Sequence, residues 1–587
     1  MWSLAVVGYL FLIGNVLSEE TESRVIVTAQ GPVRGYKDPI DDVFAYYGIP
    51  YATAPTGSQK FKAPLPPPSW LEPFDAIDSG VICPQIDTFF VQNKTHKEDC
   101  LIANVFVPDT GEKSLPVVVY VHGGAYVIGY GNMGTPKKLV SSKKIIVVTF
   151  NYRLGVHGFL CLGTEDVPGN AGMKDQVALL RWVRANIESF GGNPHDVTIA
   201  GYSAGASAVG LLMVSKMAKG LFNKVIPESG DLIAPFSVQV NPIHNAREYA
   251  KLLHIDKILL DDISKLESFY KKCPYELLQS GNVIHRSESN FLMAPCVERD
   301  VGEERFLEEN PMSLLKKGDF ENLPILYGFA DMEGLMRIDI FDQWKDRMNA
   351  NFEEFLPADL EFTNKEEKYT VAQSIKKFYF KEKAVSKDTI LDYVNYFTDV
   401  IFACPTLRTI KYLLEAGNNQ IYLYEYSYVD DSTPVVPYTE VKGANHCAQS
   451  VVVSDGLNFT HSDESDISNE LKQWKMTMRE IWLNFIIKGK PESSDIPEWL
   501  PVSGDGTPYM VLNQEFQLKE SLLKDRCAFW EKIYSKYYQS PVPPAPHLSP
   551  IKTELYSLSN LIFIRIIIYY VLITIIRVYI FNYIMLS

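Results

Sequence analysis

The residues best suited to chemistry lie at 197–205, where a short apolar run leads into a Gly-x-Ser-x-Gly pattern centred on Ser203. The run at 197–201 predicts a buried strand, and residues 207–213 predict a helix. A strand that turns sharply into a helix crowds the positions beside the serine, so both need glycine, and the turn holds Ser203 in a strained, exposed conformation. A chance loop is the alternative, but the flanking strand and helix favour a nucleophilic serine.

A second glycine-rich segment, His122-Gly123-Gly124-Ala125, follows another predicted strand at 117–121. The tetrahedral intermediate of acyl transfer carries a negative oxygen, which main-chain amides stabilise when two or three of them converge on it. Glycines allow the chain to approach that oxygen closely. We therefore expect the amides of Gly123, Gly124 and Ala204 to form an oxyanion hole. A flexible Gly-Gly turn is the alternative.

These segments need a scaffold of strands and helices to hold them in place. The rest of the chain has apolar runs and helical patterns that predict such a scaffold. Further apolar runs predict buried strands, at 145–150, 324–327 and 421–426. Residues 174–190 predict a helix that ends at Gly191, with an apolar face formed by Val177, Leu180, Val183 and Ile187. Strands that alternate with helices predict an α/β protein, with a central, mostly parallel sheet covered by helices on both faces. Residues 340–395 have a charged, helical pattern that predicts an inserted helical cap.

Length and composition bound the number of domains and the kinds of partner. The chain has 587 residues, of which 46% are hydrophobic and 22% charged, as is ordinary for a soluble globular enzyme. Its composition does not change between residues 20 and 540, so we expect one large catalytic domain over 19–540. The formal net charge of −15 at pH 7 repels phosphate backbones, which disfavours nucleic acid as a partner.

Several segments resemble the type-B carboxylesterase and cholinesterase family, over roughly residues 24–535. Glu98–Val105 and Phe190–Gly205 match the two signatures of that family. The run from Gly201 to Val209 is most similar to insect carboxylesterases, including antennal and gut forms. The resemblance implies an α/β-hydrolase fold, and it implies a buried ion pair between Arg153 and Asp175.

The same resemblance identifies two partners for Ser203: Glu333, in the segment 328–334, and His446, in the segment 443–446. The order Ser, Glu, His along the chain is the order that α/β-hydrolases use. The resemblance implies that His446 takes the proton of Ser203 and returns it to the leaving alcohol, while Glu333 holds the imidazole tautomer. It implies ester hydrolysis through an acyl-enzyme, with no metal and no organic cofactor.

Two positions depart from the family pattern. Gln449 stands three residues after His446, where relatives usually carry an acidic residue, and Ala330 stands where many have Asn. Neither side chain takes part in the proton transfers, so we expect these departures to tune the activity rather than abolish it.

The chain has eight cysteines. The resemblance implies one disulfide between Cys83 and Cys100, and another between Cys404 and Cys527. It leaves open the state of the other four, which are Cys161, Cys273, Cys296 and Cys447. Zinc is disfavoured because no two cysteines lie at close ligand spacing.

The N-terminus predicts a secreted protein. Residues 2–18 are apolar and uncharged, and the small residues Val16 and Ser18 suit cleavage after Ser18. The run is shorter than the ~20 residues that a membrane span needs, so we expect a signal peptide over 1–18. An oxidising route permits disulfides and glycosylation, for which Asn93 and Asn458 are candidate acceptors.

The C-terminus contains two unusual segments. Residues 541–560 begin with the Pro-rich run 541–546 and predict a stiff spacer. Residues 561–587 are almost wholly apolar but contain Arg565 and Arg577, and each Arg costs about 2.5–3.5 kcal/mol at the centre of a spanning helix. Three interpretations stay open: an anchor that associates the protein with a membrane, a tail removed on lipid attachment, and an unpaired apolar extension.

The sequence favours small, uncharged, hydrophobic esters of short to medium chain as substrates. The loop from Cys83 to Cys100 has Phe89 and Phe90 but no Trp, whereas cholinesterases place a choline-binding Trp there, so choline esters are disfavoured. Tyr202 stands where cholinesterases have Glu and juvenile hormone esterases have Gln. An aromatic content of 12% fits an apolar gorge for xenobiotic, odorant or dietary esters.

Two other functions fit the same fold. A neuroligin-like adhesion protein keeps the fold without the triad, but all three triad positions are filled here. A slow esterase that binds its ligands tightly would sequester them, and the sequence does not separate it from a fast enzyme.

Overall fold

The computed structural model of the chain describes residues 22–88, 91–254, 262–279, 286–455, 464, 467–504 and 508–546. The predicted signal peptide, the spacer beyond residue 546 and the hydrophobic tail at 561–587 lie outside these residues. So do Phe89, Phe90 and the candidate acceptor Asn458. Within the described ranges, no helix is both long enough and apolar enough to cross a membrane.

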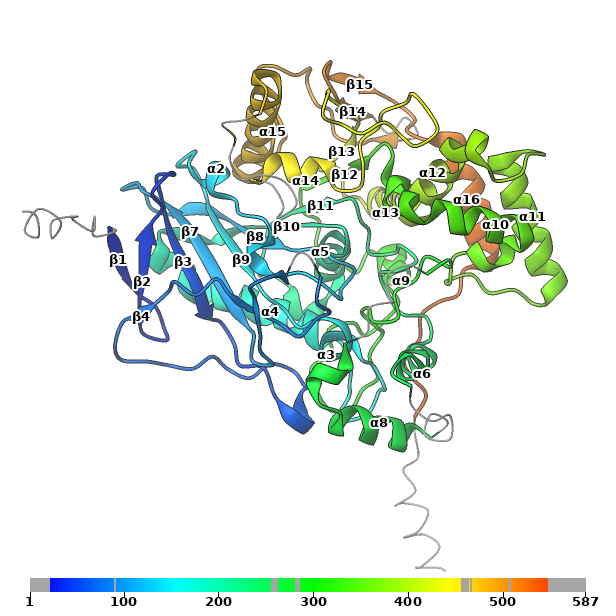
Figure 1. Cartoon of the computed structure of the whole chain (residues 1–587). Helices are drawn as coiled ribbons and strands as arrows, with labels where there is room; N and C mark the ends of the chain where they lie inside the picture. The colour runs from blue at the N-terminus through cyan, green and yellow to red at the C-terminus, as the bar shows by residue number, and fades with distance from the viewer. Residues whose placement is uncertain are drawn as a thin grey trace, which may run out of the picture.

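A mixed sheet of 13 strands organises the described part of the chain (Figure 1). Its order is β1-β2-β3-β7-β9-β8-β10-β11-β12-β13-β14-β15, with β4 paired to β2, while β5 and β6 form a separate pair. The strands are β1 (Ser23–Val27), β2 (Pro32–Lys37), β3 (Val43–Pro50), β4 (Phe74–Asp75), β5 (Val81–Ile82), β6 (Thr95–His96), β7 (Ile102–Pro108), β8 (Leu115–Val121), β9 (Ile146–Phe150), β10 (Gly192–Tyr202), β11 (Lys224–Glu228), β12 (Ile325–Ala330), β13 (Ile421–Tyr426), β14 (Tyr509–Leu512) and β15 (Gln517–Lys519).

The centre of the sheet is parallel, as predicted. Neighbouring strands from β9 to β14 pair in parallel, whereas the pairs among β1, β2, β3, β7 and β9 and the pair β14–β15 are antiparallel. All five predicted strands are found, and β13 has the predicted bounds. The other strands were not predicted, among them β11 in the middle of the sheet and β7, whose apolar run is interrupted by Asn104. In the fold Asn104 is buried, and its amide donates to Thr149 Oγ1 on β9 at 3.1 Å.

Helices cover both faces of the sheet (Figure 1). Because strand side chains alternate, Val117 and Val119 face one hydrophobic core while Val118 faces the other, beneath α2 and α15. The α-helices are α2 (Lys137–Val140), α3 (Gly155–Phe159), α4 (Ala171–Asn186), α5 (Ala204–Val214), α6 (Pro242–Leu252), α8 (Ile263–Lys272), α9 (Pro311–Lys317), α10 (Phe341–Ala350), α11 (Lys365–Phe380), α12 (Ile390–Thr398), α13 (Cys404–Glu415), α14 (Ala448–Val453), α15 (Asn469–Lys488) and α16 (Lys524–Tyr537).

Two predicted helical regions are found. The pattern at 174–190 forms α4 and a following 3-10 turn over Ile187–Phe190. Residues 340–395 form α10, α11 and α12, which lie together with α16 at the right of Figure 1.

A buried ion pair joins Arg153 to Asp175 on α4. The guanidinium donates to the carboxylate through Nη2 at 2.6 Å and Nε at 2.8 Å, and the two side chains are 2% and 0% exposed. Arg153 Nη1 also donates to the carbonyl oxygens of Lys60 and Lys62, at 3.0 and 2.7 Å. This pair therefore ties an N-terminal loop to the helix beneath the sheet.

Three disulfides cross-link the described residues. Cys83–Cys100 and Cys404–Cys527 are the two pairs that the family resemblance implied. The third, Cys161–Cys296, joins residues 135 positions apart, and the sequence had left these two cysteines open. Cys273 and Cys447 are free thiols.

We predict that Asp175→Ala destabilises the fold by about 3–5 kcal/mol, because it leaves the Arg153 charge buried without its partner. Urea unfolding followed by tryptophan fluorescence measures the change. The matched control is Glu382→Ala, which removes a carboxylate paired with Lys377 at the surface, where the side chains are 82% and 73% exposed. The control should leave the midpoint unchanged, and an equal shift in both variants contradicts the prediction.

Candidate active site

Ser203 lies in the turn between β10 and α5, with φ 56° and ψ −125°. This conformation is rare for an L-residue and costs about 1–3 kcal/mol. Neighbouring main chain holds it, because the Ser203 amide donates to Glu228 O at 2.9 Å. A Cβ atom on Gly205 would lie 2.2 Å from Val121 O, so the close approach of α5 to β8 requires glycine there. The predicted strand, strained turn and helix are all present.

The loop that follows β8 brings Gly123 and Gly124 beside this turn. A Cβ atom on Gly123 would lie 2.6 Å from Tyr202 O, and Gly124 has a φ of 105°. Within the described ranges, neither amide donates to a main-chain carbonyl. Ala204 is the first residue of α5, so its amide has no acceptor inside the helix. In the described part of the chain, the amides of Gly123, Gly124 and Ala204 thus lie near Ser203 and have no main-chain acceptor.

Buried side chains fix this glycine loop from behind. The His122 ring stacks on Tyr152 with centroids 4.4 Å apart, and His122 Nδ1–H donates to Gly123 O at 2.8 Å. Burial lowers the pKa of His122 to about 4, so the ring is neutral at pH 7. The Gln85 side chain bonds both main-chain groups of Gly129. Its Nε2 donates to the Gly129 carbonyl oxygen at 3.0 Å, and its Oε1 accepts the Gly129 amide at 2.8 Å.

Glu333 begins a 3-10 segment (η7, Glu333–Ile340) just after β12, and its side chain is 0% exposed. One carboxylate oxygen accepts the amide of Ala330 at 2.8 Å, and the other bonds His446 Nδ1. The nearby Asp331 instead accepts the Ala444 amide at 2.9 Å, and burial raises the pKa of Asp331 to about 7. The structure thus separates the two acids, since Glu333 contacts the imidazole and Asp331 holds the loop that carries it.

His446 lies in the loop between β13 and α14, between Glu333 and Ser203. Its Nδ1 bonds Glu333, which leaves Nε2 to accept the Ser203 hydroxyl at 2.9 Å. The imidazole side chain is 15% exposed, whereas the Glu333 carboxylate is fully enclosed. An alcohol, a base and a buried acid in this order can transfer a proton from the alcohol and stabilise the resulting imidazolium.

The two positions that depart from the family pattern contribute other contacts. Gln449 is fully buried, and its Nε2 donates to Ser229 Oγ at 2.6 Å. Ala330 uses its main-chain amide to bond Glu333, which any residue except proline could do. Cys447, the neighbour of His446, is a buried thiol with a φ of 63°, and burial raises its pKa.

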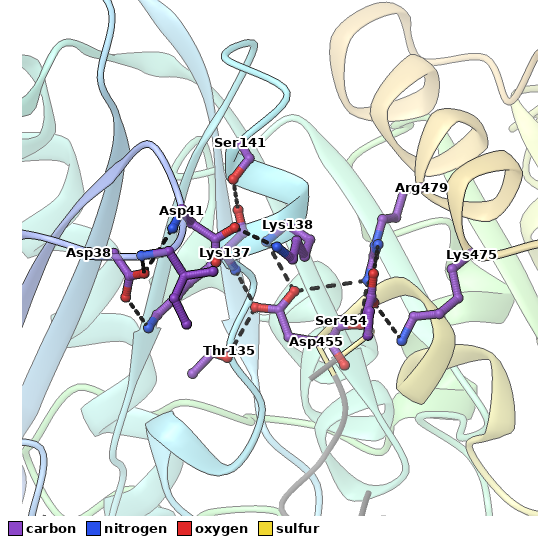
Figure 2. Close-up of polar contacts among 12 residues, drawn as sticks. Asp38, Asp41, Thr135, Lys137, Lys138, Ser141, Ser454, Asp455, Lys475 and Arg479 are labelled. Atoms are coloured by element: carbon purple, nitrogen blue, oxygen red, sulfur yellow. Dashed lines mark hydrogen bonds and ion pairs between the residues drawn. The ribbon is translucent and has the colours of Figure 1, made fainter. Parts of the chain in front are cut away.

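A polar cluster fixes the far end of α14, the helix that follows His446. Figure 2 shows Asp455 between α2 and Arg479 of α15. Asp455 accepts the amides of Lys137 and Lys138 at 2.7 and 3.0 Å. Arg479 lies 3.9 Å from Asp455 and donates to the carbonyl oxygens of Val453 and Ser454, at 3.1 Å each. The helix behind the imidazole is therefore anchored to both α2 and α15.

Aromatic side chains line the other side of the imidazole. The ring centroids of Phe402 and His446 are 4.6 Å apart. The centroid of the Phe236 ring lies 6.1 Å from that of Phe402 and 4.9 Å from that of Phe291. All three phenylalanines are buried. Phe402 therefore presents an apolar ring to the imidazole, and Phe236 and Phe291 pack in series behind it.

The structure therefore brings together all six residues that the sequence singled out, Ser203, Glu333, His446, Gly123, Gly124 and Ala204. Sequence inspection missed three buried polar residues around them, Glu228, Asp455 and Arg479. A lone charged residue at the end of an apolar run was the only signal for Glu228, and nothing in the sequence links Asp455 to Arg479.

Comparisons with known proteins agree with this geometry. Residues 22–530 match the Carboxylesterase family. Esterase FE4 of Myzus persicae is 31% identical over 78% of this chain and 83% of its own length. Juvenile hormone esterase of Heliothis virescens is 32% identical over 81% of this chain and 88% of its own length. The crystal structure of juvenile hormone esterase from Manduca sexta, with OTFP covalently attached, superposes with a TM-score of 0.78 at 28% identity, covering 88% of this chain and 100% of that one.

We predict that Gly205→Ala lowers kcat/KM about 10²-fold, because the added methyl group pushes α5 away from β8 and misplaces Ser203. Turnover of p-nitrophenyl butyrate measures the loss. Gly111→Ala is the matched control, since a Cβ atom there meets nothing within 4 Å. The prediction fails if both variants keep the wild-type kcat/KM.

Proposed function

The chain belongs to the carboxylesterase family, and on that basis we propose that it hydrolyses uncharged, hydrophobic short- to medium-chain esters, with Ser203 as nucleophile, His446 as general base and Glu333 as supporting acid. Carboxylic ester hydrolysis is the activity common to the named relatives. The observation that carries the proposal is the continuous chain of contacts from the Ser203 hydroxyl through His446 to the buried Glu333 carboxylate.

The proposed reaction has two acyl-transfer steps. His446 Nε2 takes the Ser203 proton as Oγ attacks the ester carbonyl carbon, and the amides of Gly123, Gly124 and Ala204 hold the resulting oxyanion. The intermediate collapses when His446 returns the proton to the leaving alcohol, which gives an acyl-enzyme on Ser203. Water, deprotonated by His446, then attacks the acyl carbonyl and releases the acid. Each oxyanion donor of this kind contributes about 3–4 kcal/mol.

The proposed preference for apolar substrates rests on the walls of the site. Phe402 lies against His446, and Phe236 and Phe291 extend the apolar surface, so an acyl or alcohol group that enters there loses contact with water. The juvenile hormone esterases among the relatives support an organic ester as the substrate class. The covalent adduct in the Manduca sexta structure supports a covalent mechanism.

We also propose that the protein is secreted. Three disulfides support passage through an oxidising compartment, because such bonds rarely persist in the cytosol. The candidate acceptor Asn93 is exposed, as glycosylation requires. Expression in insect cells, followed by glycosidase digestion and mass analysis of the medium and of the membrane fraction, tests secretion, the site at Asn93 and the fate of the tail.

We predict that Ser203→Ala and His446→Ala each lower kcat for p-nitrophenyl butyrate at least about 10⁴-fold, and that the double variant is no worse, because the residues act as one unit. Glu333→Gln should lose about 10⁴-fold, because it favours the wrong imidazole tautomer. Stopped-flow measurement with an organophosphate counts the active Ser203 sites.

The same measurements separate the alternatives. Stoichiometric phosphorylation of Ser203 with turnover in the range of ordinary esterases supports the enzyme. Stoichiometric phosphorylation with negligible turnover indicates an esterase that sequesters its ligand. An adhesion protein of this fold would show neither reaction, and that result would sink the proposal.

A further inference from the structure

Glu228 is a buried acid that lies beside the catalytic residues and has no role in the reaction steps above. It is the last residue of β11, its backbone pairs with Tyr202 on β10, and its carbonyl oxygen accepts the Ser203 amide at 2.9 Å. The next residue, Ser229, accepts Gln449 Nε2 of α14 at 2.6 Å. The turn after β11 therefore contacts the nucleophile on one side and the helix that follows His446 on the other.

The Glu228 side chain faces the same helix. It is 1% exposed, Tyr120 OH donates to its Oε2 at 3.3 Å, and Ser450 of α14 and Trp482 of α15 interact with the carboxyl group. Within the described ranges, Glu228 Oε1, Ser450 Oγ and Trp482 Nε1 have no partner in strict hydrogen-bond geometry. The Tyr120 and Ser450 hydroxyls and the Trp482 indole can all donate to the carboxyl group in either protonation state, and a protonated carboxyl group can in addition donate its own proton to the Ser450 hydroxyl.

The groups around Glu228 leave it without a compensating charge. The titratable side chains that face it are Tyr120 of β8, Tyr202 of β10, Tyr424 of β13 and Cys447 before α14, and burial raises the pKa of each. No described basic side chain forms an ion pair with Glu228. Burial outweighs its hydrogen bonds and raises its pKa to about 8, so the carboxyl group is mostly uncharged at pH 7.

We propose that Glu228 is a positioning residue that joins the Ser203 turn to the His446 helix and does so as an uncharged carboxylic acid. The inference rests on the proposed hydrolase function. It adds a residue whose protonation state affects the activity of the same site. Its main-chain carbonyl holds the nucleophile, while its side chain and the neighbouring Ser229 dock against α14.

The uncharged state has a catalytic reason. Negative charge develops on the substrate oxygen beside the Ser203 turn, and a carboxylate behind that turn would oppose it. The imidazolium already has the Glu333 carboxylate as its partner, so a second anion there supplies nothing that the reaction lacks. Ionisation of Glu228 should therefore lower kcat, while KM stays constant because this enclosed side chain does not touch substrate.

The test compares kcat and KM for p-nitrophenyl butyrate from pH 6 to pH 10 in the full-length protein, in Glu228→Gln and in Glu228→Ala. Wild type should lose activity on the alkaline side with an apparent pKa near 8. Glu228→Ala should lower kcat about tenfold at pH 7 with little change in KM. Glu228→Gln, which keeps the shape and cannot ionise, should recover most of that loss and extend the plateau by about one pH unit.

Asp359→Asn is the matched control. Asp359 is also a buried acid, with a pKa raised to about 6, but it accepts Tyr534 OH on α16 instead of contacting α14. This variant should keep the alkaline limb of wild type. An alkaline limb in Glu228→Gln that matches wild type overturns the proposal, as does a folded Glu228→Ala with wild-type kcat. If Glu228→Ala fails to fold, the pH profile of Glu228→Gln alone decides whether the proposal stands.

Thermal stability gives a readout that does not depend on turnover. Between pH 4.5 and about 8 the folded state binds more protons at Glu228 than the unfolded state, so stability falls as pH rises through that window. The Tm of Glu228→Gln relative to wild type should therefore increase from pH 6 to pH 9, and a constant difference refutes the uncharged state. Wild-type protein without esterase activity or organophosphate labelling refutes the proposed function instead, and this Tm comparison tells the two failures apart.

Discussion

The enclosed carboxylate of Glu333 is the constraint on which the rest of the site depends. An acid removed from water needs hydrogen-bond donors at both oxygens, and here the Ala330 amide and the His446 imidazole supply them. The first donor is local, but the second must come from a loop more than 100 positions along the chain. The fold satisfies this demand because the parallel strands β12 and β13, which lead to Glu333 and to the His446 loop, end side by side with Ala330 and Tyr426 in register.

Much of the polar interior can be understood as support for the loop that supplies the second donor. Asp331 bonds the main chain just before His446, Gln449 fastens the start of α14 to Ser229, and Asp455 and Arg479 fix its end. The buried acids Asp331, Asp455 and Glu228 are accommodated in more than one way. Asp331 and Asp455 accept main-chain amides, Asp455 lies beside an arginine, and Glu228 keeps its proton. The neighbours, and not the residue type, decide which solution applies.

The sequence predicted those parts of the structure that follow from local pattern or from family motifs. Apolar runs located β8, β9, β10, β12 and β13 but not β11, which lies between β10 and β12. The glycines around Ser203 pointed to the strained turn that holds it, because close backbone contacts demand them. Glu333 and His446 needed the family pattern, since an isolated acid or histidine has no local signature. The Cys161–Cys296 bond, the strand that contains Asn104 and the Asp455–Arg479 contact escaped prediction. Each depends on residues that are distant in sequence and become neighbours only when the sheet forms.

The disulfides also bear on how the site is assembled during synthesis. Cys161–Cys296 encloses Ser203, whereas Cys404–Cys527 encloses His446, and Glu333 lies between the two loops. A chain that emerges from its N-terminus can close the first loop, with the Ser203 turn inside it, before His446 has been translated. The hydrogen bond between Ser203 and His446 can form only after the second loop has been made, so the contacts of the proposed triad are completed late in synthesis. A product truncated before His446 could still contain the Cys161–Cys296 bond around Ser203, but it would lack the imidazole that accepts the Ser203 hydroxyl.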